Sequence, residues 1–572
     1  MNNTPENNTF PTDSLGRRIG TALDFACSSD KMLDFMRQDL GLYMSTDELK
    51  LCRENYRTSK QKDITLSELY LLDEIIRLSA NEPSNHILTD VITDDGDIID
   101  TYNDLLSKQA VLIGSVAPPL TLGAAAKISS KYMKRIGADA KDIMMLNAFK
   151  TPDGFDLSSL ISEKSQIKED LPVNTAFVIL TPTEADITEP EYRIKLEKLS
   201  HNSFFSEKIL CARFVGKAGI AVTLANLCEG IYADIYSIPE MPEVRELSHL
   251  ATECHGRLIL ALSKDNIPEL SFIASNLGLC ATYFAKAIAL DKFMLMQKKN
   301  ASMLINTSLI RRLGDMKHRS TARIIRENTD YAMTRSDIFL SDIPVKYGDT
   351  PHNKNRFLSL YSSAINKRNF LSAVYAFVDS LLPLIACGAE REDISVKTKY
   401  EFPNETSDVA LGECLSTILG IYRATCELCI ADRPLVQSSS NREVSLTCVA
   451  YADIDTPIQK TFSSSHSGVY FLSFGNSSDS LPSFDGIREM FNYVASLKKK
   501  EIIKSARAVS GKLFDTTRLM EKNSLVLSFA PNASFPTENV RGLILEVSAP
   551  IDKGIFLGTV EERVENDNFD IQ

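Results

Sequence analysis

Apolar residues recur at helical spacing in two segments of the chain. In the first segment, the residues of one face step by 4, 3, 4, 4 and 3 positions: Leu411, Leu415, Ile418, Tyr422, Cys426 and Cys429. In the second segment, the apolar face consists of Leu69, Leu72, Ile75 and Ile76. This spacing predicts helices that bury one face. We therefore predict a core helix through residues 411–429, with both cysteines buried in it and without a metal, and another helix behind residue 65.

Two capping sequences indicate where helices begin near the N-terminus. Ser45 with Glu48, and Thr65 with Glu68, each fit the S/T-x-x-E pattern, in which the two side chains bond each other's backbone N–H. The polar residues before the first helix predict a disordered tail over residues 1–30. A helical region is therefore expected behind this tail.

Two short blocks of sequence recur at nearly the same distance. Residues 212–217 (ARFVGK) return as residues 506–512 (ARAVSGK), an offset of 294 (506 − 212). Upstream, the strand-like residues 176–180 resemble residues 469–473, at an offset of 293 (470 − 177). Two matches at one offset indicate a duplicated module that contains both strands and helices.

Composition excludes several classes of function. The net charge of −12 disfavours nucleic acid and anionic membranes as partners. The longest uncharged stretch, residues 110–126, contains two adjacent prolines, which predicts a buried strand and turn rather than a membrane span. With 25 glycines in 572 residues, the chain has no GxGxxG and no GxxxxGK[ST] phosphate loop. The sequence thus predicts a cytoplasmic protein that binds neither nucleic acid nor membrane.

Two polar motifs could support chemistry. Cys426 and Cys429 form a single CxxC, whereas a zinc site needs four ligands, so core packing is the favoured interpretation and no zinc is expected. Glu253 and Arg257 precede an apolar strand. They could orient a phosphate or a metal-bound ligand, but a structural ion pair would have the same sequence.

Five blocks, in order, resemble the synthetase body of the formylglycinamide ribonucleotide amidotransferase (phosphoribosylformylglycinamidine synthase) family. They are residues 39–73, 214–239, 372–389, 412–431 and 481–520, and the resemblance extends in patches over residues 31–560. In that family a helical linker precedes a tandem pair of aminoimidazole-ribonucleotide-synthetase-like (PurM-like) units. The resemblance implies an α+β fold, ATP and Mg²⁺ as cofactors, and an amidation step of purine biosynthesis.

The resemblance also implies roles for individual residues. Glu253 and Arg257 fall on the family's S-E-x-x-x-R motif, and Gly216 and Gly219 fall on its glycine-rich segment. These four residues are the candidates for binding a nucleotide or phosphate. Ser79 stands where the family has its catalytic histidine.

The sequence departs from the family at several reactive positions. Phe214 and Asn226 replace an Asp and a Glu, and residues 436–438 replace a G-K-D-S motif. The glutaminase domain, which some members carry on a separate chain, is missing from this sequence. Neither Phe nor Asn supplies the carboxylate charge that Mg²⁺ prefers. We therefore expect impaired catalysis on an inherited fold.

The resemblance and the repeat together predict six ranges. They are a disordered tail (1–30), a helical linker-like region (31–108), a reduced first N-terminal α/β half (109–175), a first C-terminal α+β half (176–305), a second N-terminal α/β half (306–460) and a second C-terminal α+β half (461–572).

Three functions remain open. The chain could be an inactive paralogue that binds a nucleotide, a purine-pathway intermediate or other purine-pathway proteins. It could be an active synthetase subunit that uses ATP and ammonia, or it could be a structural scaffold.

Overall fold

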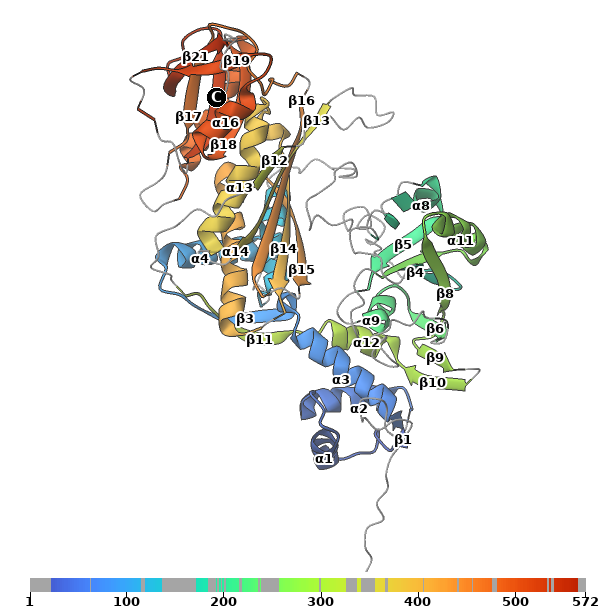
Figure 1. The fold of residues 1–572 in the computed structure, drawn as a ribbon. Helices are drawn as coiled ribbons and strands as arrows, with labels where there is room; N and C mark the ends of the chain where they lie inside the picture. The colour runs from blue at the N-terminus through green and yellow to red at the C-terminus, as the bar shows by residue number, and fades with distance from the viewer. Residues whose placement is uncertain are drawn as a thin grey trace, which may run out of the picture. The chain divides into compact units, whose positions relative to one another are not determined.

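The computed structural model divides the chain into two compact units. Unit 1 comprises Met1–Asn81 and Ile143–Lys317, and unit 2 comprises Glu82–Asp142 and His318–Gln572. The divisions after Asn81 and Lys317 differ from the predicted boundaries at residues 108 and 305. The residues that the structure describes are 22–61, 63–114, 119–135, 171–183, 192, 195–196, 198–199, 202–215, 219–234, 237, 257–297, 300–325, 337–340, 355–365, 369–404, 406–439, 442–454, 456–475, 481–531, 534–535 and 540–563. Figure 1 shows their helices and strands.

Unit 1 begins with a helical region. Its helices are α1 (Asp30–Leu40), α2 (Thr46–Thr58) and α3 (Leu66–Ala80), and a short pair of strands, β1 (Ala22–Leu23) and β2 (Ile64–Thr65), joins its ends. Both predicted capping boxes are confirmed, with Ser45 opening α2 and Thr65 opening α3. The apolar face of α3 is buried, as its spacing predicts.

Part of the predicted tail is ordered. Phe25 is fully buried, and its ring packs edge-to-face on Tyr56, with 5.6 Å between the ring centroids. The prediction of disorder is therefore wrong for residues 22–30, because one aromatic side chain anchors this segment to α2. Residues 1–21 lie outside the described residues.

The rest of unit 1 is built on a seven-stranded sheet with the order β10-β9-β6-β8-β4-β7-β5. Its strands are β4 (Ala176–Pro182), β5 (Ile209–Phe214), β6 (Gly230–Asp234), β7 (Leu258–Leu262), β8 (Leu279–Ile288), β9 (Phe293–Gln297) and β10 (Asn300–Ile305). The described helices beside it are α8 (Ser203–Lys208), α9 (Gly219–Ala225), α11 (Ile267–Asn276) and α12 (Thr307–Gly314). Residues 176–181 of β4 are all buried, as expected for an apolar strand inside a sheet.

The C-terminal part of unit 2 is built on a five-stranded sheet with the order β18-β20-β17-β21-β19. The strands are β17 (Gly468–Ser473), β18 (Ile503–Gly511), β19 (Leu525–Phe529), β20 (Val540–Val547) and β21 (Ile555–Glu562). Helices α15 (Phe484–Lys499) and α16 (Leu513–Met520) flank β18 in sequence.

These two sheets share one strand order. The order β5-β7-β4-β8-β6 of unit 1 matches β18-β20-β17-β21-β19 of unit 2, and the four corresponding pairings are antiparallel in both. Both sheets also have a bulge or irregularity at the same two places, in the pairings of β5 and β18 and in those of β4 and β17. The similarity therefore extends to local register.

The register fixes which residues correspond. Ala212 pairs with Leu260 and Ala506 with Leu545, which agrees with the predicted offset of 294 (506 − 212). Phe177 corresponds instead to Val469, an offset of 292 (469 − 177), so the predicted 293 is wrong by one residue. Strands that consist only of apolar residues give no internal mark of register.

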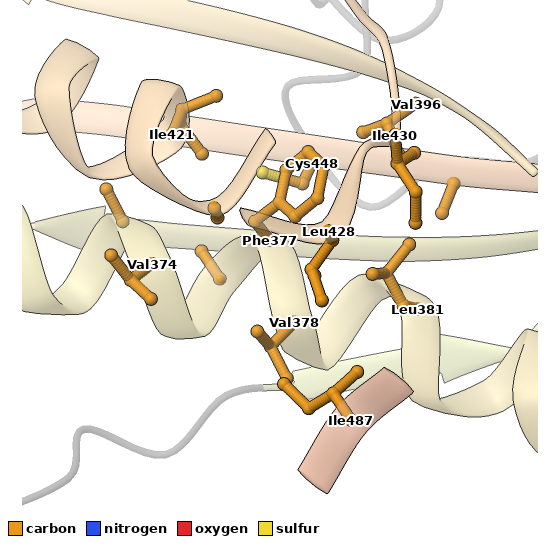
Figure 2. Packing of buried hydrophobic residues seen from close by; sticks show 14 of the residues in the cluster. Val374, Phe377, Val378, Leu381, Val396, Ile421, Leu428, Ile430, Cys448 and Ile487 are labelled. Atoms are coloured by element: carbon orange, nitrogen blue, oxygen red, sulfur yellow. The ribbon is translucent and has the colours of Figure 1, made fainter. Parts of the chain in front are cut away.

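The centre of unit 2 is a second five-stranded sheet with two long helices. The sheet has the order β12-β13-β16-β14-β15 and consists of β12 (Asp337–Leu340), β13 (Asn355–Ile365), β14 (Ser395–Pro403), β15 (Asp432–Ser439) and β16 (Val444–Ile454). Helices α13 (Asn369–Ala386) and α14 (Asp408–Leu428) share one hydrophobic core with it. In Figure 2, Phe377 of α13 lies close to Leu428 of α14 and to Cys448 of β16.

The prediction for α14 is confirmed for the helix and wrong for its last cysteine. Leu411, Leu415, Ile418 and Tyr422 are buried, whereas Cys426 is only half-buried. Cys429 is exposed, because the helix ends at Leu428 and Cys429 occupies the cap with φ 53° and ψ 40°. The buried face of the helix therefore ends about one turn before the apolar pattern in the sequence ends.

Among the described helices, α13 alone is long and apolar enough to cross a membrane. Of its 18 residues, 89% are buried inside the structure, and it is a core helix of unit 2.

Unit 2 also contains the segment that precedes the uncharged stretch. Strand β3 (His86–Ile92) pairs in parallel with β11 (His318–Arg323), and α4 (Gly96–Ile113) and α5 (Leu122–Arg135) follow β3. The predicted strand over residues 110–126 is wrong, because most of its described residues form the end of α4 and the start of α5, and the extended part is limited to one β-bridge between Thr121 and Ile87. Gly114, with φ 74°, terminates α4.

Candidate functional site

Of the predicted site residues that the structure describes, Arg257 lies beside the end of β5, Gly219 begins α9 and Ser79 lies in α3, all in unit 1. Phe214, the last residue of β5, pairs with Leu258 at the start of β7. Val215 then donates its N–H to the carbonyl oxygen of Arg257 over 2.9 Å. The backbone of Arg257 therefore lies beside the start of the segment that leads to Gly219.

Arg257 places a permanent positive charge at this end of the sheet. Its side chain is only 2% exposed, and a guanidinium stays protonated even where it is buried. Tyr192 lies nearby and donates its hydroxyl to the carbonyl oxygen of Leu180 over 3.1 Å. Burial raises the pKa of Tyr192, and the charge of Arg257 opposes part of that rise. Such a buried charge suits a phosphate ligand or a structural anion equally well.

Helix α9 is anchored at its C-terminal end. Gly219 begins the helix with φ 73°, a conformation that favours glycine, and its carbonyl oxygen accepts a hydrogen bond from the Thr223 hydroxyl of the same helix at 2.8 Å. At the other end, Arg311 of α12 donates to the carbonyl oxygens of Ala225 and Cys228 over 2.7 and 2.9 Å. These two bonds hold the end of α9 against α12.

Ser79 lies in α3, where it connects that helix to α12. Its side chain is 2% exposed and its hydroxyl is 3.3 Å from the carbonyl oxygens of both Gly314 and Met316. Gly314 in turn approaches α9 closely, since a Cβ there would lie 2.8 Å from Val222. Ser79 thus contributes to the packing of α3, α12 and α9.

The structure describes only some of the remaining residues that the sequence analysis singled out. Glu253 and Gly216 lie outside the described residues. Asn226 follows α9 and donates its backbone N–H to Val222 over 3.1 Å.

The described residues around β5 and α9 do not fit a magnesium site. Phe214 and Asn226 stand where the resemblance implies carboxylates. Among the residues that the structure describes, no group of three or more His, Cys, Asp or Glu side chains is placed to hold a metal ion. Arg257, beside the end of β5, is a cation that could bind an anion.

A polar cluster that sequence analysis missed lies in unit 2. Lys108 of α4 has its Nζ 2.8 Å from Asp104 Oδ2 and 3.3 Å from Cys426 Sγ of α14. The Tyr422 hydroxyl donates to the same Asp104 oxygen over 2.8 Å. The ring centroids of Tyr132 and Tyr422 lie 5.2 and 5.0 Å from the ammonium. Because 318 residues separate Lys108 from Cys426, no local motif indicates this cluster.

Two of the fully buried carboxylates of unit 2 come from α13 and β15. Asp379 of α13 is fully buried and forms an ion pair with Arg541 of β20 at 2.8 Å. Asp432 of β15 is also fully buried and accepts hydrogen bonds from Ser129 and Thr398 over 2.7 and 2.9 Å. Burial raises the pKa of Asp432 to about 6, against the opposing effect of its two hydroxyl donors.

The fold is shared with solved structures. PurLQS from Thermotoga maritima is 11% identical, with a TM-score of 0.50, over 69% of this chain and 72% of that one. PurL from T. maritima complexed with ADP is 12% identical, with a TM-score of 0.49, over 89% of this chain and 99% of that one. PurL complexed with ATP is 13% identical, with a TM-score of 0.48, over 70% and 72% of the two chains.

The comparison defines the class of fold. The chain has an α+β fold of the PurM-like kind that PurL also has. No protein-family model and no curated protein matches the sequence.

Proposed function

We propose that this chain is a PurL-like protein of purine nucleotide biosynthesis that binds a nucleotide or a pathway intermediate but carries out little or no ATP-dependent amidation. The observation that carries the proposal is the environment of Ser79. A hydroxyl of high pKa that is bonded to two backbone carbonyl oxygens replaces the expected imidazole, and it cannot hold or donate charge near neutral pH.

The proposed binding site lies at the end of β5, beside Arg257. The buried charge of Arg257 next to Val215 supports an anionic ligand there. ADP and ATP are the ligands to test, because PurL has been solved in complex with each. In the proposed site Arg257 neutralises a phosphate.

Titration calorimetry with ADP and ATP tests the binding. Replacing Arg257 by Met keeps an unbranched apolar side chain close to the length of the arginine stem and removes the guanidinium charge, whereas Arg257→Lys keeps a charge. A charged hydrogen bond contributes about 1.5–3 kcal/mol, so Arg257→Met should weaken binding by at least about tenfold, with Arg257→Lys in between. Circular dichroism verifies that both variants fold. If the wild-type protein binds neither nucleotide, the proposed site is wrong.

A turnover assay distinguishes this proposal from an active synthetase subunit. The assay supplies formylglycinamide ribonucleotide, ATP, Mg²⁺ and ammonia, so that no glutaminase partner is needed. We expect no detectable turnover, because several charged groups of the family are replaced together. Turnover of about 1–10 s⁻¹ would establish the alternative, an active divergent synthetase. A protein with neither binding nor turnover would be a scaffold.

We further propose that the two sheets descend from a tandem duplication. Their equal strand order, equal pairing directions and two equivalent irregularities support this origin. An experimental structure in which the modules superpose strand by strand, with Ala212 on Ala506, is the expected result. A displaced register would argue for convergence.

A further inference from the structure

The two cysteines of the CxxC sequence lie in different surroundings at the end of α14. Cys429 is exposed at the cap, and its Sγ is 3.6 Å from the carbonyl oxygen of Cys426. Cys426 is half-buried, with its Sγ 3.3 Å from the ammonium of Lys108. One thiol is therefore open to reagents in solution, and the other lies in the same helical turn beside a cation.

We propose that Cys426 and Cys429 form an oxidisable dithiol, a modification site whose reagent is a hydroperoxide. Residues three apart on a helix have Cβ atoms about 5–6 Å apart, whereas a disulfide requires about 3.5–4.5 Å. Cys429 is the cap of α14, and its N–H donates to the carbonyl oxygens of Thr425 and Cys426, so closing the remaining distance loosens only the last turn of the helix.

The reaction balances in two steps. The Cys429 thiol attacks the outer oxygen of hydrogen peroxide, which gives a sulfenic acid and one water. The Cys426 sulfur then attacks the sulfenic sulfur, forms the S–S bond and releases the second water. Two thiols and one peroxide become one disulfide and two waters, and the peroxide is the oxidant.

Lys108 is the positioning residue of the second step. Burial raises the pKa of the Cys426 thiol, and the neighbouring ammonium opposes that rise. An opposite charge at this distance changes a pKa by about one to three units, so removing it should lower the thiolate fraction about tenfold or more. Asp104 and the tyrosine rings hold the ammonium in place.

Disulfide formation would change the packing around Lys108. The Cys426 sulfur must turn toward Cys429, and the ammonium then loses one of its partners between α4 and α14. Hydrogen exchange in α4 should therefore rise when the dithiol is oxidised. A redox state at one cap would thus be transmitted to a neighbouring helix.

The test treats the full-length protein with one equivalent of hydrogen peroxide and identifies the products by peptide mass spectrometry. We expect a disulfide between Cys426 and Cys429, and in Cys426→Ser a sulfenic acid on Cys429 that dimedone traps. Cys280 is the internal control, because it is exposed and its Sγ is 3.6 Å from the Thr282 hydroxyl instead of another cysteine. It should accumulate no intramolecular disulfide.

Lys108→Met should slow closure of the disulfide about tenfold and leave the first oxidation of Cys429 unchanged. Circular dichroism and the rate of Cys280 oxidation verify that the variant is folded. The proposal is overturned if no disulfide forms between Cys426 and Cys429, or if the sulfenic acid of Cys429 persists in the wild-type protein. Equal closure rates with and without Lys108 would overturn the role of the lysine.

Discussion

Replacing the buried carboxyl of Asp432 by an amide should stabilise unit 2 at neutral pH. The side chain is fully buried, and its oxygens accept from the hydroxyls of Ser129 on α5 and Thr398 on β14. In Asp432→Asn the amide oxygen can still accept from Ser129, while its N–H donates to the Thr398 oxygen, since a hydroxyl both donates and accepts. The substitution therefore removes the charge and preserves the bonds.

The magnitude follows from the pKa of the carboxyl. Burial raises the pKa of Asp432 from 3.8 to about 6, a difference of about two pH units, or about 3 kcal/mol at 1.36 kcal/mol per unit. Because the folded state holds this proton more tightly than the unfolded state, the contribution to stability is fully present below pH 3.8. It is lost as the pH rises through about 6. At neutral pH the ionised carboxylate therefore destabilises the fold relative to an amide.

Urea denaturation between pH 4 and pH 8 measures this change in the free energy of unfolding. The unfolding of unit 2 is followed by the hydrogen exchange of peptides from α5 and β14. The free energy of unfolding of Asp432→Asn should exceed that of the wild type by about 1–3 kcal/mol at pH 7.5, and the difference should shrink toward zero near pH 4. Asp485→Asn is the control, since that carboxylate is 86% exposed and should change stability little at any pH. A difference independent of pH, or a loss of stability at pH 7.5, would refute the reasoning.

Three further substitutions test the packing. Asp379→Ala leaves Arg541 buried without its carboxylate and should lower the free energy of unfolding of unit 2 by about 3–5 kcal/mol in urea; a loss below about 1 kcal/mol would mean that the pair is solvated. Gly420→Ala should destabilise α14 by about 1–3 kcal/mol despite its better helix propensity, because the new Cβ would lie 2.3 Å from a backbone carbonyl oxygen. Gly96→Ala, which meets nothing within 4 Å, is its matched control, and the two thermal midpoints should move in different directions or by clearly different amounts. Ser45→Ala removes the cap of α2 and should cost about 1 kcal/mol, measured as faster hydrogen exchange in the first turn of that helix; unchanged exchange there would exclude a stabilising cap.

Local signals predicted local structure well. The capping residues Ser45 and Thr65 open the helices that their spacing predicts, and Ala212 and Ala506, the first residues of the repeated block, lie on corresponding strands. Each of these features depends on residues that are neighbours in sequence. Sequence alone therefore defined where several elements begin and which of them are similar.

Features that depend on distant partners were missed. The end of α14 at Leu428 exposes Cys429, although the apolar pattern continues through it. The stretch over residues 110–126 is helical up to Ile113 and again from Leu122, because uncharged Ala and Leu are as compatible with a buried helix as with a strand. The environment of Arg257 likewise requires a strand pairing that no spacing reveals. These outcomes are set by tertiary contacts, which a short window of sequence does not contain.

The division of unit 2 into two separate stretches of chain has a consequence during synthesis. Helix α5 buries Ile128 in the same core as Ile418 of α14, but the ribosome adds 290 residues (418 − 128) between them. At about 5–20 residues per second, this interval lasts roughly 15–60 s. During that time the apolar side of α5 has no finished core to enter, whereas unit 1 is completed first, at Lys317. The nascent chain should therefore bind chaperones through α4 and α5, and release should follow the emergence of α14.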